Sequence, residues 1–259
     1  KETGQKTLLG APKAEVPAPA LVVLDDAGFD FRNRPELWPS ALSNKNFKGN
    51  VLLKLSDPVA KGPLWDKLVS EHASRLVVIV TADDLRASGM QLSRALSWER
   101  TAQDAFWELT HNREISALSE CAAIIVSFRA AGCLLLTRQP DGSSRCKLVF
   151  DPTKIEGSWE AGFEGRLIGY NTCLVAAVAL ELLRSQTPDL STALRGGLAA
   201  MRALHKEGYA LVKKHQKVTS LAFPVKSLAK AIAGQKGEFR EAPIADPVRH
   251  LTLPRDENS

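Results

Sequence analysis

Short, strongly apolar segments alternate with helical segments along most of this chain, and that order limits the folds open to it. The apolar segments are Ala20–Leu24, Val51–Leu55, Leu76–Thr81, Ala122–Phe128, Cys133–Thr137 and Cys146–Phe150. They are too apolar for strands with one face in water, which alternate polar and apolar residues. Apolar residues at helical spacing occupy Leu64–His72, Trp98–Thr110, Leu174–Arg184 and Thr192–Leu204. The alternation predicts an α/β fold, a Rossmann-like three-layer sandwich in which helices cover both faces of a mostly parallel sheet.

The same pattern predicts the extent of the domain. We expect residues 20–225 to form one α/β domain, preceded by a flexible lead-in over 1–19 and followed by an irregular tail or linker over 226–259 that is rich in Pro, Gly and charge. The pair Gly196-Gly197 inside the last predicted helix indicates close packing against a neighbour. The first residue is Lys1 rather than Met, so we expect a fragment of a larger, multidomain protein.

Composition narrows the cellular setting. No apolar stretch approaches the roughly 20 residues that a membrane span needs, and no signal peptide is evident. The four cysteines lie beside apolar residues without CxxC pairing, which predicts buried free thiols and a cytoplasmic, reducing compartment.

The charge of the chain favours small anionic ligands. The formal net charge is +5, but the Lys and Arg residues are spread along the sequence instead of gathering with aromatic residues. This favours phosphates over nucleic acid as a partner. The chain has no GxxxxGK[ST], GxGxxG or GxSxG motif, which argues against P-loop ATPases, ordinary dehydrogenases and serine hydrolases of the α/β type. Oligomeric state cannot be predicted from these residues.

Acidic residues follow several of the predicted strands. The junctions read Asp25-Asp26-Ala27-Gly28, Ser56-Asp57-Pro58, Thr81-Ala82-Asp83-Asp84 and Asp151-Pro152. Ligands of open parallel sheets bind outside the carboxyl ends of the strands, so these positions are candidates for binding a phosphate together with Mg²⁺, with Asp84 as the candidate metal ligand. The alternative is structural, because an Asp after a strand often caps the next helix or shapes a turn.

Two segments in the second half carry a resemblance to a known family. Thr81-Ala82-Asp83-Asp84-Leu85 follows one predicted strand, and the later stretch 124–136 contains Ser127, Arg129 and Gly132. Their order resembles the C-terminal half of the ribokinase-like superfamily of sugar and vitamin kinases, where a strand leads to Asn-x-x-Glu and a later strand ends in Thr-x-Gly-x-x-Gly. Ser127 stands for the Thr, Arg129 for the usual Gly, and only Gly132 matches. The resemblance implies that these residues bind a nucleotide.

A third segment is similar to the signature Gly-Ala-Gly-Asp of that family. It reads Gly169-Tyr170-Asn171-Thr172 and precedes an apolar helix. In the family, the free amides of this helix stabilise charge on the transferred phosphoryl group, and the Asp takes the proton from the substrate hydroxyl. Asn171 or Thr172 occupies the position of that Asp, and neither is a base near neutral pH. Loss of a general base costs about 10²- to 10⁴-fold in rate.

The N-terminal part of the chain adds to the resemblance. Leu21 to Arg32, with Leu37-Trp38 beyond, resembles the mid-chain strand of sugar kinases that ends in Asp-x-Asn-x-Arg and a Leu-Trp pair. This alignment leaves no counterpart for the N-terminal half of the family, which binds the sugar and forms the lid.

Two functions follow as expectations. In the first, the domain binds a nucleotide or phosphorylated small molecule without turnover and passes its occupancy to a neighbouring domain. In the second, it is an active ATP- and Mg²⁺-dependent kinase that phosphorylates an alcohol group of a sugar or vitamin, with Asp25, Asp26 or Asp84 in place of the family Asp. The replacement at Asn171 favours the first.

Overall fold

The chain folds around one seven-stranded sheet. The computed structural model describes residues 19–25, 31–56, 59, 64–92, 98–128, 132–150, 171–201 and 240–244. The strands run in spatial order β1 to β7 and are β1 (Leu21–Asp25), β2 (Asn50–Lys54), β3 (Leu76–Thr81), β4 (Ala123–Ser127), β5 (Gly132–Arg138), β6 (Ser144–Phe150) and β7 (Arg240–Pro243). All six predicted apolar segments are strands, with bounds that differ from the prediction by a residue or two.

Most strands of the sheet point the same way. β1, β2, β3 and β4 pair in parallel, while β4–β5, β5–β6 and β6–β7 are antiparallel pairs. β6 therefore runs in the direction of β1 to β4, and only β5 and β7 run against it. The β5–β6 hairpin turns at Gly142, whose φ of 84° favours glycine. The predicted mostly parallel sheet is confirmed.

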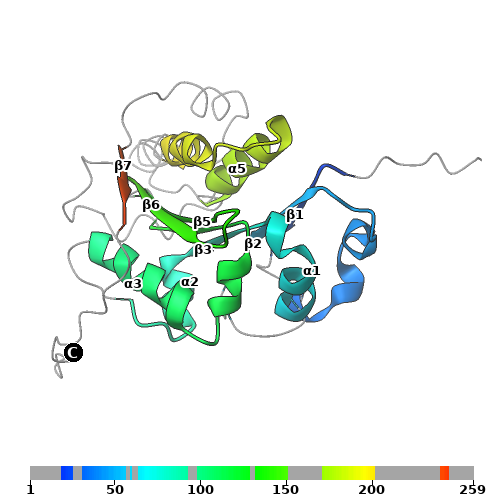
Figure 1. Ribbon diagram of the computed structural model, residues 1–259, viewed down its shortest axis with the longest axis horizontal. Helices are drawn as coiled ribbons and strands as arrows, with labels where there is room; N and C mark the ends of the chain where they lie inside the picture. The colour runs from blue at the N-terminus through cyan, green and yellow to red at the C-terminus, as the bar shows by residue number, and fades with distance from the viewer. Residues whose placement is uncertain are drawn as a thin grey trace, which may run out of the picture.

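Helices cover both faces of the sheet (Figure 1), which confirms the three-layer arrangement. On the lower face in Figure 1 lie α1 (Ser70–His72), α2 (Ala82–Ala87) and α3 (Trp98–His111), and on the upper face lie α5 (Thr172–Arg184) and a helix over 190–201. The remaining helical segments are η1 (Phe31–Asn33), η2 (Pro35–Leu37), η3 (Ser40–Ser43), the π-helix η4 (Leu64–Val69), η5 (Ala73–Arg75) and η6 (Ser116–Glu120). No helix among the described residues is long and apolar enough to cross a membrane.

Side-chain alternation divides the strands between two cores. Along β3, Val78 and Val80 pack with the helices of the lower face, whereas Val77 and Ile79 pack with α5 and the 190–201 helix. Successive side chains of a strand point to opposite faces, so apolar residues are needed at every position. This is the physical reason for the continuous apolar segments in the sequence.

The last strand lies in the tail that was expected to be irregular, so that prediction is wrong for residues 240–243. β7 pairs with β6, and Glu241 forms ion pairs with Lys147, at 3.4 Å, and with Arg195 of the upper helical layer. The strand Arg-Glu-Ala-Pro has no apolar run, and its Pro243 suits an edge position. Backbone pairing with β6 and the ion pairs of Glu241 hold this strand in place, and Ile244 directly after it packs against the lower core.

All four cysteines are free and buried, which confirms the expectation of buried free thiols. Burial raises the pKa of Cys121 and of Cys146 to about 12. Both thiols therefore stay protonated near neutral pH and act as small apolar groups in the core.

Close packing at Gly197 is also confirmed, and it generates a stability prediction. A Cβ at this position would lie 2.9 Å from Leu174 Cδ1 and 3.0 Å from Leu174 Cα. We expect Gly197→Val to lower the free energy of unfolding by about 1–3 kcal/mol, because the new atoms would force the two helices apart. Urea denaturation measures the change. Leu183→Val is the control, since Leu183 is 55% exposed on α5; equal effects of the two variants would contradict the tight contact.

A buried histidine joins the first two crossover connections. His72 Nε2 donates to the Leu42 carbonyl at 3.2 Å, and His72 Nδ1 accepts from Arg75 Nη2 at 2.6 Å. Arg75 also donates to the Phe47 carbonyl and lies over the Phe47 ring, 4.9 Å from its centroid. Both ring nitrogens of His72 are used in the neutral state. Burial is the larger cause that holds the pKa of His72 below its usual value, and the Arg75 guanidinium is the second. The Leu42 carbonyl and Glu71 act in the opposite direction and raise the pKa.

The depressed pKa of His72 predicts how stability depends on pH. The unfolded chain protonates His72 near pH 6.5, before the folded chain does, so lowering the pH below about 6.5 should reduce the free energy of unfolding. Above that pH the contribution is constant. Urea denaturation between pH 8 and pH 5.5 should show a shallower decline for His72→Gln than for the unaltered chain. His111→Gln is the control, because His111 is exposed on α3; identical slopes for His72→Gln and the unaltered chain would refute the assignment.

Candidate functional site

The register of the sheet brings several predicted residues to its carboxyl edge. Thr81 at the end of β3 pairs with Ser127 at the end of β4, and Ser127 pairs with Cys133 near the start of β5. Gly132 stands beside Cys133 at the same edge. On the other flank, Asp25 ends β1 next to Lys54 of β2. Thr81, Ser127 and Gly132 are thus grouped, and Asp25 lies two strands away from Thr81.

These side chains point to the face that α5 covers. Ile79 and Ile125 belong to the upper core with α5, and Thr81 and Ser127 come two residues later on the same strands. Residues two apart along a strand share a face. Thr81 and Ser127 therefore form a polar end to an otherwise apolar row beneath the upper helices.

Thr81 and Asp84 satisfy each other at the start of α2. The Asp84 backbone N–H donates to Thr81 Oγ1 at 3.0 Å, while the Thr81 N–H and hydroxyl donate to Asp84 Oδ2 at 3.2 Å and 2.5 Å. This is a capping box, which uses both side chains to pair backbone donors of the first helical turn. At this junction, Asp84 therefore caps the following helix, which is the structural role given in the sequence analysis as the alternative to ligand binding.

The other described acid at the edge is paired as well. Lys54 Nζ donates to Asp25 Oδ1 at 3.2 Å and to Asp25 Oδ2 at 3.1 Å. Among the described residues, no three His, Cys, Asp or Glu side chains come close enough to hold a metal ion. Asp84 lies in its capping box and Asp25 beside Lys54. Asp26, Asp57 and Asp151 lie outside the described residues, so the Mg²⁺ site stays a prediction.

Basic side chains at this edge were not among the predicted site residues, although Arg32 ends the segment that resembles the mid-chain strand of sugar kinases. Lys54 closes β2, and Arg32 Nη2 donates to the Ser56 carbonyl at 2.8 Å just beyond it. Arg240 begins β7 at the same edge. The sequence signals for these cations were a lysine at the end of an apolar segment and an arginine after the first predicted strand. Lysine and arginine are common in loops, so these signals do not by themselves indicate a binding site.

Ser127 is the least satisfied polar residue of the group. Its side chain is 1% exposed, and its hydroxyl has no oxygen or nitrogen partner among the described residues. Across the β4–β5 pair its neighbour is the Cys133 thiol, which is only a weak hydrogen-bond partner. Burial raises the pKa of that thiol, and the hydrogen bond with Ser127 opposes the rise. A buried hydroxyl without a good partner costs about 1–3 kcal/mol.

Gly132 has a structural explanation. A Cβ at this position would lie 2.5 Å from the Val149 carbonyl oxygen and 3.1 Å from Phe150 Cα. Only a residue without a side chain therefore fits where β5 and β6 approach each other, and this packing explains the glycine without a ligand.

Asn171 and Thr172 stand at the start of α5. The Asn171 carbonyl accepts from the Leu174 and Val175 N–H groups, but its side chain makes no capping bond, and its Oδ1 is buried with no partner in the part of the chain that the structure describes. Thr172 is the first helical residue and is exposed. The start of α5 thus holds a second buried polar group that lacks a good partner among the described residues.

Five predicted site residues lie outside the described residues, as does the Asp151 junction. The five are Asp26, Asp57, Arg129, Gly169 and Tyr170.

Comparisons with solved structures found distant similarities. A PdxK of Plasmodium falciparum with AMP-PNP and PL is similar at 9% identity and a TM-score of 0.46, over 77% of this chain and 62% of that one. A 2-dehydro-3-deoxygluconokinase of Thermotoga maritima gives 13% identity and a TM-score of 0.43, over 83% and 60% of the two chains. A pyridoxal kinase of Leishmania donovani with ADP gives 13% identity and a TM-score of 0.43, over 80% and 64%.

The present chain therefore spans less than two thirds of each of these structures. No model of a known protein family matches the sequence, and no curated protein matches it.

The capping box generates a prediction that separates its two possible roles. We expect Asp84→Ala to lower the free energy of unfolding by about 1 kcal/mol through loss of the cap. Asp83→Ala is the matched control, because Asp83 pairs with Arg86 on the surface at 2.9 Å and should contribute less than about 0.5 kcal/mol. Urea denaturation reports both. A ligand role for Asp84 would instead show as lost nucleotide binding at unchanged stability.

Proposed function

We propose that this domain binds a nucleotide or phosphorylated small molecule at the carboxyl edge of the sheet, between the ends of β3 and β4 and the upper helical layer. The buried hydroxyl of Ser127, whose partner among the described residues is only the weak thiol of Cys133, is the observation that carries the proposal. Polar groups in protein interiors are almost always well paired, so a hydroxyl with such a weak partner at a sheet edge is a candidate ligand contact. An anionic ligand would accept a hydrogen bond from this hydroxyl.

The surroundings of Ser127 support an anion. Arg32 and Lys54 lie along the same carboxyl edge, and the described carboxylates there are paired with Lys54 or with the start of α2. The first turn of α5 adds backbone amides and the positive end of a helix dipole on the covering layer. Among the described residues, Arg32 and the first-turn amides of α5 thus offer donors to an anion, and the carboxylates Asp25 and Asp84 are each already bonded to other groups.

Binding without phosphoryl transfer is favoured over catalysis. The side chain at the start of α5 is the Asn171 amide, which cannot take a proton from a substrate hydroxyl near neutral pH. We therefore propose a sensing role, in which occupancy is passed to another part of a larger protein. An ATP- and Mg²⁺-dependent kinase acting on an alcohol is the alternative that the experiment must exclude.

The Ser127 hydroxyl provides the test. We expect Ser127→Ala to leave the free energy of unfolding unchanged or to raise it by up to about 1 kcal/mol, because a buried, poorly paired hydroxyl is removed. The same variant should show a smaller thermal shift with ATP or ADP than the unaltered protein. Ser74→Ala is the control, since Ser74 is an exposed serine of η5 at the opposite edge, just before β3.

The outcomes separate three cases. A nucleotide-induced shift that Ser127→Ala reduces, without ADP release in the presence of Mg²⁺ and a panel of sugars and vitamin alcohols, supports the sensing role. ADP release with any of these alcohols would establish the kinase. The absence of a shift with any nucleotide or phosphorylated sugar, or equal shifts in the Ser127→Ala and unaltered proteins, would refute the proposed site.

A further inference from the structure

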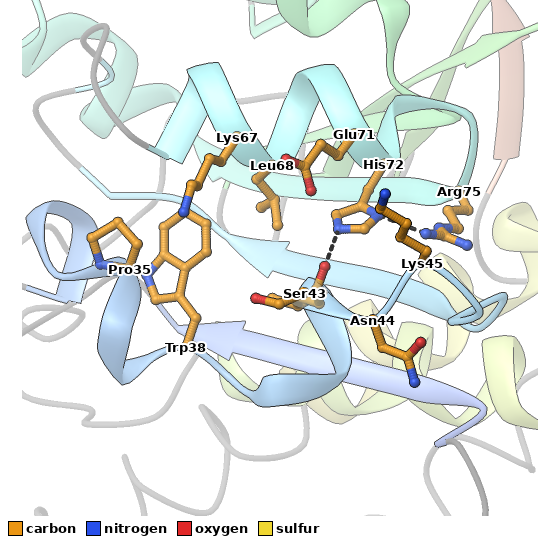
Figure 2. A pocket seen from close by; sticks show the side chains of 11 residues that line it. Pro35, Trp38, Ser43, Asn44, Lys45, Lys67, Leu68, Glu71, His72 and Arg75 are labelled. Carbon is orange, nitrogen blue, oxygen red and sulfur yellow. Dashed lines mark hydrogen bonds between the residues drawn. The ribbon is translucent and has the colours of Figure 1, made fainter.

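A cavity of about 540 Å³ lies between the first two crossover connections of the sheet. One wall is the segment from η2 through η3 to Lys45, and the other is the continuous helical segment of η4, α1 and η5 (Figure 2). The volume is within the range of about 300–1,000 Å³ that is typical of small-molecule sites. Nothing in the proposed function uses this cavity.

The cavity is separate from the carboxyl-edge site. Leu42 and Leu68, which line it, belong to the core beneath the lower face of the sheet. Thr81 and Ser127 point to the opposite face, where α5 packs. A ligand in the cavity would therefore not touch Ser127.

The charges around the cavity favour an anion. Its lining carries three cationic side chains, Lys45, Lys67 and Arg75, against one carboxylate, Glu71. Arg75 is already bonded to the Phe47 carbonyl and to His72, and His72 is neutral for the reasons given above. Lys45 and Lys67 have exposed side chains whose ammonium groups form no ion pair with the described part of the chain. These two are the cations left to meet a ligand.

One end of the cavity carries an aromatic ring. Figure 2 shows the Trp38 indole, Pro35 and the Lys67 side chain at this end and Lys45 with Arg75 at the other, with Glu71 between them. Trp38 is partly buried, packs against the lower core and also lines the cavity, so part of its indole contributes to the cavity wall. Planar rings stack on such surfaces. Asn44 lies near Lys45 and adds an amide to the polar end.

The wall behind the polar end is fixed in place. His72 is 5% exposed and bonded through both ring nitrogens, to Leu42 of one wall and Arg75 of the other. A ligand entering here would find a preorganised surface, which reduces the entropy cost of binding.

We propose that this cavity is a second binding site, for a purine mononucleotide or a close analogue. The base stacks against Trp38, the phosphate meets Lys45 at the opposite end, and Glu71 accepts a hydrogen bond from an amino group on the base. The Glu71 carboxylate then binds the amino group of the base, and the phosphate balances the excess positive charge of the cavity lining. A simple phosphate would leave the apolar end and Glu71 unused.

The test uses AMP as the probe with the whole chain. Calorimetry should show AMP binding, and adenosine and ribose 5-phosphate should each bind at least about tenfold more weakly, because each lacks one half of the recognised groups. Lys45→Glu should weaken AMP binding by about tenfold or more. Lys48→Glu is the matched control, since Lys48 is exposed on the same connection but does not line the cavity. It should bind within about twofold of the unaltered chain.

Each outcome is decisive for this site. Because Ser127 is remote from the cavity, Ser127→Ala should retain AMP binding, and its loss in that variant would assign the binding to the carboxyl edge instead. Equal effects of Lys45→Glu and Lys48→Glu would reduce the interaction to general charge attraction. No AMP binding at millimolar concentration, or ribose 5-phosphate binding as tightly as AMP, would overturn the proposal. Failure of nucleotides to bind at the carboxyl edge would leave this test unaffected.

Discussion

Burial of both faces of the parallel strands is the constraint on which the rest of the structure depends. β2, β3 and β4 have helices above and below, so a slip of one residue in register would still place apolar side chains on each face. What such a slip would misplace is the polar residue that ends each strand. Thr81 and Ser127 pair because β3 and β4 are in this register. Burial of both faces therefore stabilises the sheet, and the strand register decides which polar residues meet at its carboxyl edge.

The sequence predicted the sheet well because apolar content is a local signal. Six strands and the helices of both layers followed from it, with boundaries displaced by a few residues where pairing partners rather than composition end a strand. β7 could not be predicted in this way. Its four residues Arg-Glu-Ala-Pro join the sheet through backbone pairing with β6 and through the ion pairs of Glu241, and these partners are distant in sequence.

The candidate site was predictable in position but not in role. Sequence reasoning placed Thr81, Asp84 and Ser127 at strand ends, which the structure bears out, and could not decide which of them cap and which lack a good partner. The structure separates them by their hydrogen bonds. Thr81 and Asp84 satisfy each other, whereas among the described residues Ser127 Oγ has only the weak Cys133 thiol and Asn171 Oδ1 is buried without a partner. Residue type alone does not distinguish the two roles, because the short, polar side chains of Ser, Thr, Asn and Asp suit helix caps and ligand contacts equally well.

Even spacing of charge along the sequence does not imply even spacing in space. Lys45 and Lys67 are on successive crossover connections, so the parallel topology places them around one cavity although 21 residues separate them. Arg32 and Lys54 come to the carboxyl edge by the same crossover geometry. The spacing of cationic residues in the sequence therefore does not show where they gather in space. A modest net charge of +5 is compatible with a local excess of cationic side chains around one cavity, because the fold brings together residues from successive connections.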